Sequence, residues 1–74
     1  MRRVLAFYQF LNLEDPQVEC DRLQTLGDEL ALRVTILVAG EGVNGTVVGD
    51  VQALHQLSEH LTERYGVKSQ KWSD

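Results

Sequence analysis

Cysteine, proline, aromatic and basic residues are all scarce in this chain of 74 residues. Its one cysteine, Cys20, excludes an internal disulfide and a cysteine-based zinc site, and it favours a reducing, cytosolic setting. Seven Lys and Arg residues stand against eleven Asp and Glu residues, so the net charge is -4. The chain therefore lacks the basic surface of a protein that binds phosphate backbones by itself, and nucleic acid would need a basic surface from elsewhere in a longer protein.

Long apolar segments are also missing. No apolar run approaches the roughly 20 residues that cross a membrane, and the chain does not open with the charged, apolar and small-residue regions of a secretory signal. We therefore expect a cytoplasmic protein with no membrane partner. Because 43% of the residues are hydrophobic and no linker or repeat is visible, residues 1–74 are predicted to form a single domain around one core.

The hydrophobic pattern predicts the order strand, helix, strand, strand, helix, strand. Helix starts are expected at Asp15–Pro16 and at Asp50, and Gly66 is expected to stop the second helix. Gly27 lies inside the first helix and indicates a close approach of that helix to the sheet. The predicted elements are residues 4–10, 16–31, 33–39, 46–49, 51–64 and 67–72.

This order of elements is that of the split βαβ plan. It predicts an α+β, ferredoxin-like βαββαβ sandwich of two layers, in which both helices cover one face of a four-stranded antiparallel sheet. Right-handed connections place the first and third strands in the centre and the last strand at an edge. The loop 11–14, a hairpin tip at residues 40–45 and the turn near Gly66 are then expected to share one end of the sheet.

The predicted hairpin contains glycines at positions 40, 42 and 45, in the spacing G-x-G-x-x-G. A dinucleotide site needs a helix after this string, whereas branched residues that favour a strand follow it here. A protein kinase loop does lie between two strands, but it needs a longer chain and a Lys on the next strand. We interpret both matches as coincidental, and we interpret Asn44–Gly45 as the signal of a tight turn.

Three roles stay open for this tip: a turn alone, contact with another domain or protein, or direct contact with a ligand or RNA. The candidate binding residues are Glu41, Gly42, Asn44, Gly45 and Thr46. Tyr8 and Phe10 are expected on the face of the sheet that has no helices. Docking against a second domain is the favoured use of that face, because the acidic charge of the chain argues against base stacking.

Other reactive residues form no constellation. His55 and His60 lie about 140° apart around a helix, so they do not share a metal-binding face. Cys20 is expected to be a small buried hydrophobe rather than a nucleophile, because no histidine is near it in the sequence. We therefore predict no catalytic residue, no metal site and no cofactor.

The chain resembles the N-terminal domain of the rhodanese-like tRNA uridine hydroxylases in three segments: A-F-Y-Q-F, T-I-L-V-A-G-E-G-V-N-G-T-V-V-G and K-W-S. Residues 41–46 are the most specific part, and the family usually has another residue at Gly40. The resemblance implies an acylphosphatase-like domain of a cytoplasmic, multi-domain protein that uses oxygen to hydroxylate the wobble uridine of certain tRNAs. The family's catalytic cysteine lies in a downstream rhodanese domain, so Cys20 does not inherit that role.

The resemblance thus implies an accessory module cut from a longer protein. Its partner would be the rhodanese domain of the same chain, and it would contact tRNA only in the full-length protein. Acylphosphatase activity is not expected, because the loop 11–14 has neither Gly nor Arg and Glu14 would repel a phosphate. The alternative is a small-molecule or ion-binding sensor, for which Glu14, Asp15 and Glu41 disfavour an anion and leave room for a cation or an amine.

Overall fold

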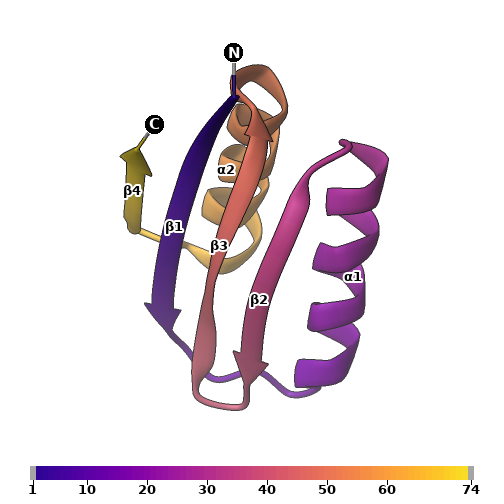
Figure 1. Cartoon of the computed structure of the whole chain (residues 1–74). Helices are drawn as coiled ribbons and strands as arrows, with labels where there is room; N and C mark the ends of the chain where they lie inside the picture. Colours follow the sequence, from indigo (N-terminus) through magenta and orange to yellow (C-terminus); the bar gives the residue numbers. More distant parts are fainter. Residues whose placement is uncertain (1, 74) are drawn as a thin grey trace.

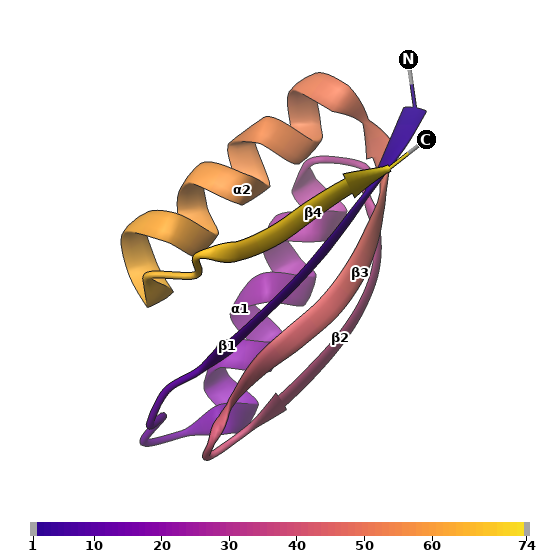
Figure 2. The same ribbon diagram turned by 90° about the vertical axis from the view of Figure 1, so that its left-hand side faces the viewer.

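A computed structural model of the chain describes residues 2–73. Its elements are β1 (Arg2–Phe10), α1 (Pro16–Glu29), β2 (Arg33–Ala39), β3 (Gly42–Asp50), α2 (Val51–Tyr65) and β4 (Ser69–Ser73). The sheet is antiparallel throughout, in the order β2-β3-β1-β4 (Figure 1). Figure 2 shows both helices on one side of the sheet. This is the predicted ferredoxin-like sandwich, with β1 and β3 in the centre and β4 at an edge.

The predicted helix boundaries are confirmed where a cap marks them. The Asp15 carboxylate accepts the backbone N–H of Val18 at 3.3 Å, and the Asp50 carboxylate accepts that of Gln52 at 3.1 Å. Gly66 ends α2 in the left-handed conformation, with a φ of 65°. Each cap satisfies backbone groups that the helix itself leaves without partners.

The first helix is shorter than predicted, because it ends at Glu29. Ala31 takes a φ of 56°, and the N–H of Leu32 returns to the carbonyl oxygen of Gly27 at 2.8 Å. The close approach predicted at Gly27 is confirmed: a Cβ there would lie 2.3 Å from Cγ2 of Val34 on β2. Glycine therefore lets the end of α1 lie directly on the sheet.

One apolar core fills the space between the sheet and the helices. The first strand contributes Leu5 and Phe7, which alternate with residues on the opposite face. The buried core consists of Leu5, Phe7, Leu23, Leu32, Val43, Val47, Leu54, Leu57, Leu61, Tyr65 and Val67. Because both helices lie on this side, the other face of the sheet is left uncovered by the described residues (Figure 2). We refer to it as the open face.

Candidate functional site

The hairpin between β2 and β3 is shorter than the predicted six-residue tip. Ala39 pairs with Gly42, so the turn itself contains only Gly40 and Glu41. The prediction of a tip over residues 40–45 is therefore wrong, and β3 begins four residues before Thr46.

The Asn44–Gly45 pair is part of β3 and does not form a turn. Neither residue has a positive φ, which within residues 2–73 occurs only at Ala31 and Gly66. Both residues are paired on two sides, with β1 and with β2. Pairing with two neighbouring strands thus overrides the local turn preference of Asn-Gly.

Gly42 and Gly45 allow β3 to pack closely against its two neighbouring strands, β1 and β2. A Cβ on Gly42 would lie 2.5 Å from the carbonyl oxygen of Gln9. A Cβ on Gly45 would lie 2.8 Å from Cγ1 of Ile36 and 2.8 Å from a carbonyl oxygen of β2. Gly40 has no heavy atom within 4 Å of such a Cβ, and it is the position at which the resembling family usually has another residue. Strand packing therefore explains the glycines at positions 42 and 45 but not Gly40.

The five candidate binding residues are divided between three places. The open face carries Gly42, Asn44 and Thr46, which alternate with the buried residues of β3. Gly45 points toward the helices, opposite Phe7 of β1 and Ile36 of β2. Glu41 is exposed in the turn. The structure thus brings Glu41, Gly42 and Asn44 together at one end of the open face and separates Gly45 from them.

Large apolar side chains gather at the same end of the open face. Phe10 is 78% exposed, Leu37 is 72% exposed and Tyr8 is 53% exposed. The rings of Tyr8 and Phe10 meet edge to face, with their centroids 6.1 Å apart. The position of the two aromatic residues agrees with the prediction. Leu37 was missed, although its place in the alternation of β2 marks it as a residue of this face.

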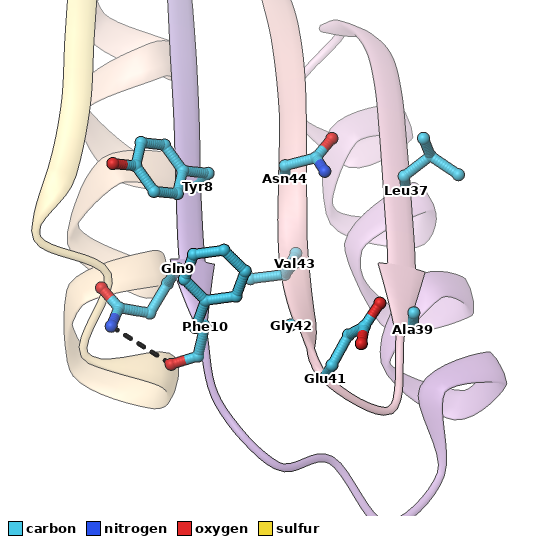
Figure 3. A pocket seen from close by; sticks show the side chains of 9 residues that line it. All are labelled: Tyr8, Gln9, Phe10, Leu37, Ala39, Glu41, Gly42, Val43 and Asn44. Carbon is cyan, nitrogen blue, oxygen red and sulfur yellow. Dashed lines mark hydrogen bonds between the residues drawn. The ribbon is translucent and has the colours of Figure 1, made fainter.

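These residues surround a shallow hollow of about 350 Å³ (Figure 3). Tyr8, Asn44 and Leu37 lie in one row across three strands, because Asn44 pairs with each of the other two. Figure 3 shows the rings of Tyr8 and Phe10 on one side of Asn44 and Leu37 on the other side. The side chain of Glu41 lies at the lower end of the hollow in this view. Among the nine residues that line the hollow, Glu41 is the only charged one.

The loop 11–14 closes this end of the sheet. The backbone N–H of Leu11 donates to the carbonyl oxygen of Glu41 at 3.1 Å, and that of Leu13 donates to the carbonyl oxygen of Gly40 at 3.0 Å. Two of the loop's donors are thus committed to the turn, and Glu14 adds a negative charge beside it. This arrangement is unsuited to holding a phosphate in the loop.

A second polar cluster joins the two helices on the other side of the domain. Glu19 on α1 accepts hydrogen bonds from Arg64 Nη2 at 2.8 Å and from the Tyr65 hydroxyl at 2.7 Å. The guanidinium of Arg64 lowers the pKa of Glu19 to about 2. Burial, together with the bond to Glu19, raises the pKa of Tyr65 to about 12. The cluster therefore holds Glu19 ionised and ties α1 to the end of α2.

The remaining reactive residues stay apart from one another. The ring of His55 lies against Trp72 with centroids 4.7 Å apart, whereas His60 meets Tyr65 edge to face at 6.1 Å. Cys20 is partly buried, whereas the sequence predicted a small buried hydrophobe. Residues 2–73 contain no group of three or more His, Cys, Asp or Glu side chains arranged to hold a metal ion. No helix within the described range is both long and apolar enough to span a membrane.

Comparison with known proteins identifies the family to which this chain belongs. Residues 2–74 match the model of the UPF0176 acylphosphatase like domain. The chain belongs to this family. Its structure is also similar to the de novo designed protein Ferredog-Diesel, with a TM-score of 0.68 over all of this chain and 85% of that one. The identity of 14% limits this second likeness to the fold.

Curated proteins from several bacteria that are similar to this chain are named tRNA uridine(34) hydroxylase. The protein from Acinetobacter baumannii is 43% identical over 58 residues, which are 78% of this chain and 18% of the relative. The protein from Deinococcus radiodurans is 45% identical over 58 residues, and that from Synechocystis is 37% identical over 67 residues. The Synechocystis match covers 90% of this chain and 24% of the relative. The chain thus spans about a fifth of the length of these relatives.

Proposed function

We propose that this chain is the accessory, non-catalytic domain of a cytoplasmic tRNA uridine hydroxylase. Oxygen-dependent hydroxylation of the wobble uridine then belongs to the remainder of the longer protein. The family match and the name shared by the relatives support this assignment. The hydrogen bonds described for residues 2–73 mainly stabilise the fold, and the two histidines lie in separate environments.

The observation that carries the proposal is the apolar end of the open face. A sheet that faces water on one side normally carries polar residues there. Phe10 and Leu37 are instead more than two thirds exposed, and Tyr8 lies beside them. A compact cluster of this kind on a small domain marks an interaction surface. We assign this surface to docking on the rhodanese domain of the same longer chain, with tRNA positioned by the assembled protein.

A chimaeric enzyme tests the proposal. In it this chain replaces the matching segment of the A. baumannii relative, and the measured quantities are tRNA binding and tRNA hydroxylation. Phe10→Ser combined with Leu37→Ser removes the apolar contacts, and Asn44→Ala with Thr46→Ala tests the candidate binding residues of β3. We expect both pairs of changes to lower hydroxylation at least tenfold, because docking energy is concentrated in a few central side chains.

The matched control is Val18→Ser. Val18 is also an exposed apolar residue, at 46%, but it lies on α1 on the opposite side of the domain. This variant is expected to hydroxylate tRNA like the parent chimaera. Circular dichroism must show that all variants are folded. Full activity in folded open-face variants would refute the docking role.

A further inference from the structure

The hollow on the open face combines features that select a positively charged side chain. Its walls are the aromatic rings of Tyr8 and Phe10 on β1 and the apolar side chain of Leu37 on β2. Its only charge is the carboxylate of Glu41, which rises from the turn toward Ala39. We infer that this hollow receives an arginine side chain of the domain on which the chain docks, an inference that rests on the proposed function.

The chemistry of the lining suits a guanidinium group. Neighbouring strands lie about 4.8 Å apart, so the backbones that carry Tyr8 and Leu37 are about 10 Å apart, with Asn44 between them. A flat guanidinium can stack on an aromatic ring and at the same time donate two parallel hydrogen bonds to a carboxylate. A lysine ammonium is a more strongly hydrated point charge and does not combine these two contacts. Arginine therefore matches the rings and the carboxylate together.

The local charge supports a cation and opposes RNA. Glu14 and Asp15 follow in the loop whose N–H groups bind the turn, so this end of the sheet carries three carboxylates. The basic residues of the open-face rows lie away from the turn: Arg2 pairs with Asp50, Arg33 pairs with Val48, and Lys71 pairs with Ala6. Lys68 is nearer, since its backbone N–H donates to the side chain of Gln9, but it is one base against three carboxylates. The carboxylate of Glu41 would repel the phosphate of a nucleotide bound in the hollow.

Asn44 completes the recognition surface. Its side chain lies on the floor of the hollow, between the rings and Leu37 (Figure 3). The amide oxygen can accept a third N–H of a guanidinium, which carries five donors. Gly42, next to Glu41, has no side chain that would cover the floor. Five of the nine lining residues thus have a specific part in holding one arginine: Tyr8 and Phe10 form an aromatic wall, Leu37 forms an apolar wall, Glu41 supplies a carboxylate and Asn44 supplies an amide.

NMR titration of the isotope-labelled chain with a blocked arginine, N-acetyl-arginine-methylamide, tests the inference. Binding in the millimolar range is expected from one side chain without the rest of a partner. The amide signals of Glu41, Gly42 and Asn44 should shift on titration. Glu41→Gln should weaken binding about five- to tenfold, since it replaces the charge at nearly constant shape. Glu59→Gln, which removes one charge from the outer side of α2, should change it less than twofold.

Three parallel titrations can overturn the inference. Equal binding of N-acetyl-norleucine-methylamide would make the hollow a purely apolar contact, and tighter binding of uridine monophosphate would make it an RNA site. Absence of shifts with the arginine compound would also refute it. A dimer that dissociates on Glu41→Gln, seen by sedimentation, would assign the arginine to a second copy. If the chimaera with Phe10→Ser and Leu37→Ser still loses activity in these cases, the proposed docking role stands and only the inference of a bound arginine is refuted.

Discussion

The substitution Gly45→Ala is the sharpest test of the explanation that close strand packing requires a glycine in β3. In Gly45→Ala the new methyl group would lie 2.8 Å from Cγ1 of Ile36 and 2.8 Å from the carbonyl oxygen of Thr35. The second atom belongs to the backbone of a paired strand, so rotation of a side chain cannot relieve the contact. We therefore expect β3 to be forced away from β2.

The expected loss follows from two opposing effects. Overpacking of a tight interior site costs about 1–3 kcal/mol. Replacing glycine by alanine restricts the unfolded chain and stabilises the fold by about 0.4–1 kcal/mol. The net expectation for Gly45→Ala is a destabilisation of about 1–2 kcal/mol, or a fall in Tm of about 5–15 °C for a domain of this size.

Gly40→Ala is the matched control within the same string of glycines. Its Cβ would meet no heavy atom within 4 Å, and Gly40 does not have a positive φ. This variant should be as stable as the parent or more stable by up to about 1 kcal/mol. Urea unfolding followed by circular dichroism gives both free energies by linear extrapolation. The reasoning fails if Gly45→Ala keeps the parental stability, or if both substitutions destabilise the domain equally.

Three further predictions concern the cluster between the helices. Because the folded pKa of Glu19, about 2, lies below its ordinary value of 4.5, its contribution to stability is complete above about pH 4.5 and is lost as the pH falls toward 2. Glu19→Gln should remove this part of the acid dependence, together with about 1–2 kcal/mol at neutral pH, measured by urea unfolding at several pH values. Tyr65→Phe removes a hydrogen bond of 2.7 Å and should cost about 1 kcal/mol, while ultraviolet titration of the parent should place the Tyr65 pKa near 12. Burial lowers the pKa of His60 from 6.5, so the parent should lose stability as the pH falls below about 6.5, and a parent-like loss in His60→Gln would contradict this assignment.

The fold could be predicted because several local signals agree with the global arrangement. Asp15 followed by Pro16 marks the first helix, Asp50 and Gly66 bound the second, and all three have the expected roles in the structure. The branched residues over 33–39 also predicted a strand, and β2 has these bounds in the structure. Ala31 is a different case: nothing in its side chain favours a positive φ, so the end of α1 could not be located from the sequence.

The candidate site could be predicted only in part, because the glycines allow two explanations. Asn44–Gly45 has the preference of a tight turn, and only pairing of β3 with both neighbours shows that it is strand. The reason for a glycine at position 42 is visible only in the structure, where a Cβ on Gly42 would lie 2.5 Å from the carbonyl oxygen of Gln9. Both facts depend on residues distant in sequence, and local patterns do not contain them.

β1 has apolar residues on both of its faces, and its position in the sheet shows what each face contacts. Apolar residues on both faces are typical of a strand covered on both sides. Here only one side is covered by helices, yet Tyr8 and Phe10 continue the apolar character on the other. The next row of the same face is polar where Thr35 pairs with Thr46, and beyond it Val48 pairs with Val4, both of which are partly buried. On the open face, the large apolar side chains that are exposed gather at one end, with a carboxylate at the rim. This arrangement is therefore better explained by a partner of limited contact area and positive charge than by a lost third layer of the domain.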